Sequence, residues 1–226
     1  MKLDYNIIYS SRRKKLTITV ERDRSVVVKA PKGTPQEKIA QLVESRKQWL
    51  YEKINHSPKY EALDPPGKEL VNGESLLYLG RNYPIKLVDS VTQIQLFNNA
   101  FLVPNQHPHQ PRDIFQSWYI QQAKENIPPR VDLYAQRLGV EYNQVKVINS
   151  KYRWGSCTPK NNLTFNWRLI KAPMFVIDYV VVHELAHLLE PNHTPRFWNI
   201  IKAQITNMEK AKHWLKYNGA ILEQTL

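Results

Sequence analysis

The sequence predicts an α+β protein with a β-rich N-terminal region, residues 1–110, followed by a C-terminal core, residues 111–226. Short segments in which apolar and polar residues alternate, separated by Gly, Asn and Asp, indicate strands in the first region. From residue 112 onward apolar residues recur at helical spacing, and one of the predicted helices carries two histidines four residues apart. We therefore expect a small sheet and several helices around a histidine-bearing helix.

The composition is that of a soluble globular protein. Hydrophobic residues make up 42% and charged residues 23% of the 226 residues, which is ordinary for this class. No apolar run approaches the ~20 residues needed to span a membrane, and the N-terminus lacks the apolar stretch of a secretory signal. Because Cys157 is the only cysteine, no intrachain disulfide can form. We expect a cytoplasmic protein with no membrane partner.

Positive charge is concentrated at the two ends of the chain. The net charge is +12. Residues 1–60 carry 14 Lys and Arg against 6 Asp and Glu, residues 61–115 carry 4 against 6, and residues 116–226 carry 14 against 8. A basic protein of this kind suits a nucleic-acid or other polyanionic partner. A solvated basic surface without a partner explains the charge equally well, so DNA is one of two interpretations of the basic ends.

The N-terminal region is expected to begin with strands and a helix. Strands are predicted at residues 5–9, 16–20 and 26–28, the last two joined as a hairpin by a turn at residues 22–25. A helix then runs to about Asn55, with Thr34 as its N-cap and Pro35 at its first position.

A linker, residues 56–68, separates this segment from a second set of strands. These strands are predicted at residues 76–79, 83–88, 94–97 and 101–103. Gly80 and the pair Asn98-Asn99 mark chain reversals. His107 and His109 lie in a proline-rich loop, where such a pair is usually incidental, and we assign them no role.

The C-terminal region is predicted to be mainly helical. A helix from Arg112 is expected to break at Pro128-Pro129 and to resume until Gly139. A strand begins near Val145, and alternation over residues 163–169 predicts a half-buried strand. Three helices complete the prediction: one opened by Pro173, one started by Thr194 and Pro195, and one ended by Asn218 and Gly219.

A His-Glu-x-x-His motif at residues 183–187 is the strongest functional signal. Residues four apart lie on one face of a helix, so His183 and His187 can hold one metal ion. Glu184 lies about 100° around the helix, close enough to reach a water on the metal without ligating it. The helix is otherwise apolar, and burying these polar residues is costly unless something satisfies them. Hydrogen-bonded core histidines are therefore the weaker interpretation.

A third ligand has to come from chain that turns back after the helix. Pro191 cannot continue the helix and Asn192 tolerates turn geometry, so His193 can reach the metal. Three imidazoles with one open position suit a catalytic zinc ion. Zinc lowers the pKa of its bound water to about 7, and Glu184 can take the proton as that water attacks a carbonyl. We predict hydrolysis of a peptide bond, with residues 163–169 either pairing with the extended substrate or serving only as structure.

Four segments resemble the YgjP-like family of predicted zinc metallopeptidases: Lys151-Tyr152-Arg153-Trp154-Gly155-Ser156-Cys157, Asn166-Trp167-Arg168-Leu169-Ile170, residues 177–187 around the motif, and Asn192-His193-Thr194-Pro195-Arg196-Phe197-Trp198. Weaker likeness extends over nearly the whole chain. The catalytic core of this family is similar to SprT-type and Wss-type zincins, some of which cleave proteins crosslinked to DNA. The resemblance implies a minimal zincin core, with zinc on His183, His187 and His193 and with Glu184 as the catalytic acid and base.

Several other residues are candidates for the site. Glu209 lies at a distance where related zincins place a glutamate ligand, although we prefer the histidine of the turn. Cys157 can approach the metal, but a lone cysteine after a Trp-Gly-Ser turn is more often buried packing. Arg153, His213 and Tyr217 have the chemistry to stabilise an oxyanion, and nothing in the sequence places them.

Two classes of function therefore remain open. The first is a peptidase acting on proteins or peptides, including DNA-bound proteins in view of the basic ends. The second is a basic nucleic-acid-binding module whose metal site is structural or vestigial. Glu184 favours the enzyme, because a structural site has no need of a base beside its ligands. The oligomeric state is not predicted.

Overall fold

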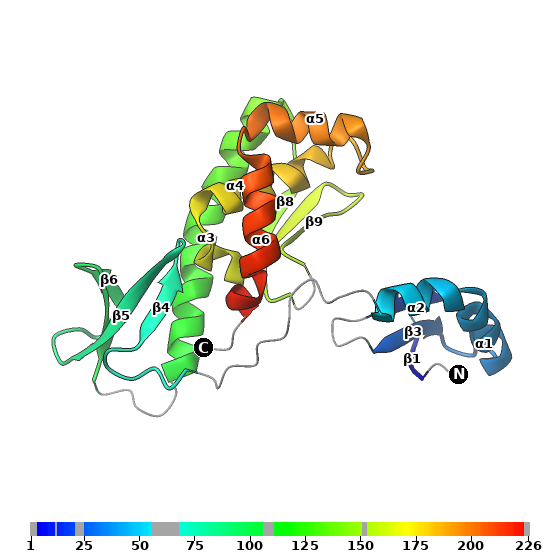
Figure 1. The fold of residues 1–226 in the computed structure, drawn as a ribbon, viewed down its shortest axis with the longest axis horizontal. Helices are drawn as coiled ribbons and strands as arrows, with labels where there is room; N and C mark the ends of the chain where they lie inside the picture. Colours follow the sequence, from blue (N-terminus) through cyan, green and yellow to red (C-terminus); the bar gives the residue numbers. More distant parts are fainter. Residues whose placement is uncertain are drawn as a thin grey trace. The chain divides into compact units, whose positions relative to one another are not determined.

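The computed structural model describes residues 4–11, 13–20, 25–55, 68–105, 111–150 and 153–223. The chain forms two compact units, Met1–Lys59 and Tyr60–Leu226 (Figure 1), and each has its own hydrophobic core. The mixture of small sheets and helices confirms the predicted α+β class. The expected linker, apart from Lys68, and the loop with His107 and His109 lie outside the described residues.

The first unit is a three-stranded sheet packed against two helices. Its elements are β1 (Tyr5–Ser10), β2 (Thr17–Val20), β3 (Val26–Pro31), α1 (Gln36–Ser45) and α2 (Lys47–Asn55). β2 and β3 form the predicted antiparallel pair, and β1 pairs with β3 in parallel. Val26, Val28 and Ala30 on one face of β3 are buried together with Ile39 and Leu50 of the helices, and Val27 on the other face is also buried, as expected for the central strand of the sheet.

The predicted single helix of this unit is wrong in two details. Arg46 (φ −108°, ψ 9°) separates α1 from α2. Thr34 does not cap α1, because its hydroxyl donates to the Pro31 carbonyl over 2.8 Å and Pro35 occupies the N-cap position.

The second unit begins with a four-stranded sheet in the order β4-β5-β7-β6. Its strands are β4 (Ser75–Tyr78), β5 (Arg81–Val88), β6 (Gln95–Phe97) and β7 (Ala100–Pro104). The β4–β5 turn has positive φ at Leu79 and Gly80. Their amides donate to the carbonyls of Ile170 and Lys171 at 3.0 and 2.9 Å. This sheet is therefore attached to the segment that leads into the histidine-bearing helix. The boundary between the two compact units lies after residue 59. The predicted boundary at residue 110, between the β-rich region and the catalytic core, concerns function and stays a prediction.

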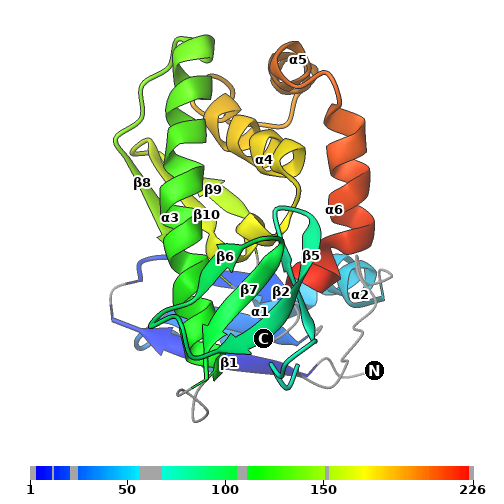
Figure 2. The ribbon, with the colours of Figure 1, turned by 90° about the vertical axis from the view of Figure 1, so that its left-hand side faces the viewer.

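The remaining elements surround the motif helix. They are α3 (Pro111–Leu138), β8 (Gln144–Ile148), β9 (Gly155–Cys157), β10 (Asn162–Asn166), the 3-10 helix η1 (Trp167–Lys171), α4 (Met174–Ala186), α5 (Pro195–Gln204) and α6 (Met208–Glu223). The three strands form a second sheet in the order β8-β10-β9. Helix α4 lies between α3 and α6 and also contacts α5 and β9 (Figure 2).

Three sequence predictions are corrected here. Helix α3 continues through Pro128 and Pro129; its buried face and the Arg130–Asp178 ion pair, 2.6 Å, attach it to α4. The strand predicted over residues 163–169 ends at Asn166, whose side chain accepts a hydrogen bond from Arg168 N and caps η1. Helix α6 runs past Gly219 to Glu223. Among the described residues, no helix combines the length and apolarity required to cross a membrane.

Candidate metal centre

Helix α4 places two histidines at its C-terminal end. Its residues from Val176 to Val182 are buried, as are Leu185 and Ala186, so the helix is packed on nearly every side as predicted. His183 and His187 lie one turn apart on the same face of the helix, with ring centroids 5.1 Å apart. His187 is the C-cap residue of the helix, so the chain is free to turn immediately after it.

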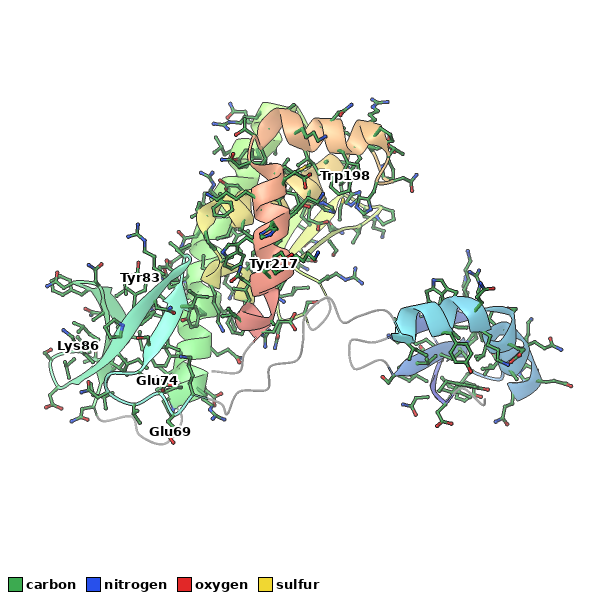
Figure 3. All side chains as sticks on the ribbon, viewed as in Figure 1. Glu69, Glu74, Tyr83, Lys86, Trp198 and Tyr217 are labelled. Carbon is green, nitrogen blue, oxygen red and sulfur yellow. The ribbon has the colours of Figure 1, made fainter. Side chains whose placement is uncertain are left out.

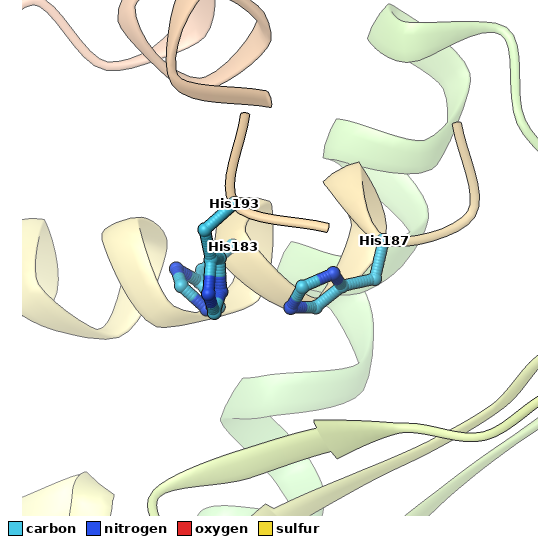
Figure 4. Close-up of side chains that lie close together, drawn as sticks. All are labelled: His183, His187 and His193. Atoms are coloured by element: carbon cyan, nitrogen blue, oxygen red, sulfur yellow. The ribbon is translucent and has the colours of Figure 1, made fainter. Parts of the chain in front are cut away.

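The turn after α4 returns His193 to this face. Helix α5 starts at Pro195 with Thr194 as its N-cap, accepting from Phe197 N as predicted. His193 Nε2 lies 3.2 Å from His183 Nε2. One nitrogen of each of the three histidines lies within 4.8 Å of the others (Figure 4). In a tetrahedral zinc site with Zn–N bonds of about 2.0–2.1 Å, ligand nitrogens are roughly 3.3 Å apart. The His183–His193 separation matches this spacing, and a nitrogen of His187 lies within 4.8 Å of both.

The surroundings of the histidines favour ligation. His187 Nδ1 lies 3.3 Å from the Glu190 carbonyl oxygen, an arrangement that directs Nε2 toward a metal. Burial lowers the pKa of His187, which favours the neutral form that a metal ligand requires. Phe197 is fully buried, and its ring contacts all three imidazoles at centroid distances of 4.6–4.9 Å.

Glu184 is buried beside strand β9, with 7% of its surface exposed. Gly155 of β9 approaches it so closely that a Cβ at this position would lie 2.7 Å from both Cγ and Oε1 of Glu184. Burial raises the pKa of Glu184 to about 7, while the Arg153 charge and a hydrogen bond from the Cys157 backbone N–H act in the opposite direction. A carboxyl group with a pKa near neutrality can both accept and donate a proton at physiological pH.

The other candidates occupy different places. Glu209 is outside the histidine cluster, and its side chain is 71% exposed and pairs with Lys212 at 3.2 Å. The rings of His213 and Tyr217 contact each other, with centroids 4.2 Å apart, and His213 does not belong to the cluster formed by His183, His187 and His193. Burial and the charge of Glu184 raise the pKa of Cys157, which disfavours the thiolate that a metal ligand needs.

Sequence reasoning missed the residues that support the site. Gly155, Phe197 and Trp198 belong to the segments quoted for the family resemblance, but no spacing rule gave them a role. Trp198 stacks on His193 with ring centroids 5.6 Å apart and planes inclined by 24°. Arg153, which the sequence could not place, lies near enough to Glu184 for its charge to act on that carboxyl.

Comparison with known proteins links the chain to peptidases. The YgjP-like family, described as a metallopeptidase domain, matches residues 14–218. No curated protein matches significantly in sequence. Two crystal structures of metallopeptidase zymogens show limited likeness. Abylysin of Pyrococcus abyssi has a TM-score of 0.35 and 20% identity over 38% of this chain and 86% of that chain. Jannalysin of Methanocaldococcus jannaschii has a TM-score of 0.36 and 18% identity over 40% and 93%.

Proposed function

The chain belongs to the YgjP-like family of metallopeptidases, and we propose that it hydrolyses peptide bonds with a zinc ion held by His183, His187 and His193. The observation that carries this proposal is the convergence of three imidazole nitrogens within 4.8 Å on the helix that also carries the buried Glu184. Three neutral imidazoles and one open position are the donor set of a catalytic zinc site. When bound, zinc would lower the pKa of a coordinated water to about 7 and polarise the substrate carbonyl.

Glu184 carries the proton in this proposal. Its carboxylate accepts a proton as the water oxygen attacks the carbonyl carbon. It then donates that proton to the leaving nitrogen when the C–N bond breaks, so that water is divided between the two products. The hydrogen bond from the Cys157 N–H and the contact with Gly155 hold the carboxyl group against β9, which fixes the position from which it acts.

The substrate is expected to bind along β9. Residues 163–169 cannot supply the pairing edge considered from the sequence, because β10 is the central strand and pairs with β8 and β9 on its two sides. Within the described residues β9 is an edge strand, and it contacts α4. An extended peptide that adds to this edge would present its carbonyl groups close to Glu184.

The basic first unit supports DNA-associated proteins as a substrate class. Residues 1–60 hold 14 Lys and Arg against 6 Asp and Glu. Lys14 and Lys15 are exposed in this unit. Such charge binds phosphates without regard to base sequence, and would raise the local concentration of proteins already on DNA. A binding module with a structural metal site is the alternative, and it would leave the protein without cleavage activity.

These proposals are tested by cleavage of an unfolded protein, with and without single-stranded DNA. The wild type should cleave, and Glu184→Gln should retain zinc but lose at least about a hundredfold in rate. DNA should stimulate the wild type, and Lys14→Glu/Lys15→Glu should lose only the stimulation. Equal cleavage by Glu184→Gln would refute the assigned base. Stoichiometric zinc without cleavage of any unfolded protein or peptide would support the binding module.

A further inference from the structure

His193 is the only one of the three histidines that lies outside a helix or helix end, so regular secondary structure does not fix its position. His183 and His187 are half-buried at the end of α4, whereas His193 is exposed and lies between α4 and α5. An exposed side chain outside regular structure loses conformational entropy when it is fixed on a metal. Tight metal binding therefore depends on neighbours that already hold the imidazole in its ligating orientation.

The indole of Trp198 is the neighbour that fits this role. It projects from α5 (Figure 3) and stacks on the His193 ring, with centroids 5.6 Å apart and an angle of 24° between planes. It also meets His183 edge-on, with centroids 6.0 Å apart. Stacked pairs of this kind restrict ring rotation while leaving the ring nitrogens free. The ligand and its support come from one short segment, because Thr194, between His193 and α5, caps that helix.

Helix α6 supports the indole in turn. Lys212 Nζ lies 5.0 Å from the centroid of the Trp198 ring, a cation–π distance. Lys212 is also paired with Glu209, 3.2 Å away. Glu209, the alternative ligand considered from the sequence, thus joins the site indirectly, through Lys212 and Trp198.

We propose that Trp198 is a positioning residue that holds His193 in its ligating orientation, with Lys212 steadying the indole from α6. This inference rests on the proposed function, since it requires His193 to bind the metal. Removing a group that orients a metal ligand typically weakens metal binding by about 10–100-fold. Trp198→Ala should therefore weaken zinc binding by at least about tenfold. Trp198→Phe keeps an aromatic face and should stay within about threefold of the wild type, and Lys212→Ala should lie between the two.

The test is a zinc titration against a chromophoric chelator, with the melting temperature of each metal-free variant measured in parallel. Trp214→Ala is the matched control, because Trp214 is also half-buried and packs against the same hydrophobic core, but it belongs to α6 and not to the segment that carries His193 and Trp198. A purely structural tryptophan would lower the melting temperature without changing the zinc affinity of the folded protein.

The outcomes separate the two proposals. Weakening by Trp198→Ala, with near-normal binding by Trp198→Phe and Trp214→Ala, is the expected result. The inference is overturned if Trp198→Ala binds zinc as tightly as the wild type, if Trp198→Phe is as weak as Trp198→Ala, or if Trp214→Ala is equally weak. A wild type that binds no zinc, copper, nickel or manganese would instead contradict the proposed metal site itself.

Discussion

A methyl group added at Gly155 tests how strictly the site depends on the position of Glu184. In Gly155→Ala the new Cβ would lie 2.7 Å from Cγ and Oε1 of Glu184 and 3.0 Å from Cδ. An ordinary contact begins at 3.4 Å, so the carboxyl group must move by roughly 0.7 Å, and a misplacement of this order costs about 30- to 100-fold in rate. The backbone at Gly155 is outside the positive-φ region, so alanine itself adds no backbone strain.

The assay is peptide hydrolysis measured together with zinc content. We expect kcat/KM to fall by about 30- to 100-fold. The three atoms nearest to the added methyl group all belong to Glu184, which is not one of the proposed ligands, so the zinc stoichiometry should not change. Ser156→Ala is the matched control on the same strand. It removes a hydroxyl that lies 2.7 Å from Thr164 Oγ1 and adds nothing toward the base, so it should stay within about threefold of the wild type.

A double variant shows whether the loss acts through Glu184. If Gly155→Ala acts only by displacing the base, Gly155→Ala/Glu184→Gln should be no slower than Glu184→Gln alone, since groups that act as a unit are not additive. A folded, zinc-loaded Gly155→Ala enzyme with wild-type activity would refute the reasoning. A further large loss in the double variant would show that β9 acts by another route.

Three further predictions concern the metal, a buried lysine and a turn. His193→Ala should bind zinc at least about a hundredfold more weakly, measured by chelator competition; full zinc retention would remove it from the ligand set. Burial lowers the pKa of Lys171 from 10.5 to about 7. Between pH 7 and 10.5 the unfolded chain therefore binds more protons at this residue than the folded chain does. The destabilisation by Lys171 grows as the pH falls through this range and is largest below pH 7. Lys171→Met should therefore raise the free energy of unfolding, by at most roughly 5 kcal/mol below pH 7, and this increase should become smaller as the pH rises toward 10.5. Urea unfolding at several pH values measures it, and an increase that does not change with pH would contradict the prediction. Gly80→Ala should destabilise the protein by about 2–4 kcal/mol, because the new Cβ would lie 2.5 Å from Pro173 Cγ and the residue has φ +78°. Gly73→Ala is the control: Gly73 has φ +89° but open space around it, so the substitution should cost only about 1–2 kcal/mol in the same urea-unfolding measurement.

Local patterns in the sequence predict elements well where a single neighbouring interaction decides them. Thr194 before Pro195 correctly predicts the start of α5, since the cap is made within one turn. Pro128-Pro129 wrongly predicts a break, because packing and the Arg130–Asp178 pair hold α3 together across the two missing donors. Similarly, alternation predicts a strand up to Leu169, yet Asn166 caps η1 at the point where both faces of the chain become buried. Contacts between distant segments decide these cases.

The candidate site follows the same division. Helical spacing predicts that His183 and His187 share a face, and Pro191 predicts the turn that brings His193 back to them. In the structure one nitrogen of each of these histidines does lie close to the others. The supports of the site are non-local and carry no spacing signature. The approach of Gly155 to Glu184 depends on how β9 packs on α4, and the stacking of Trp198 depends on the direction in which α5 leaves the turn.

X-ray absorption spectroscopy of the zinc-loaded protein tests the central claim most directly. Three imidazole nitrogens and one additional light atom at about 2.0–2.1 Å are predicted for the wild type, and His193→Ala should lose one imidazole contribution. A sulfur neighbour at about 2.3 Å would place Cys157 at the metal. Two imidazoles with a carboxylate, unchanged in His193→Ala and lost in Glu209→Ala, would transfer the third ligand to Glu209 and contradict the account.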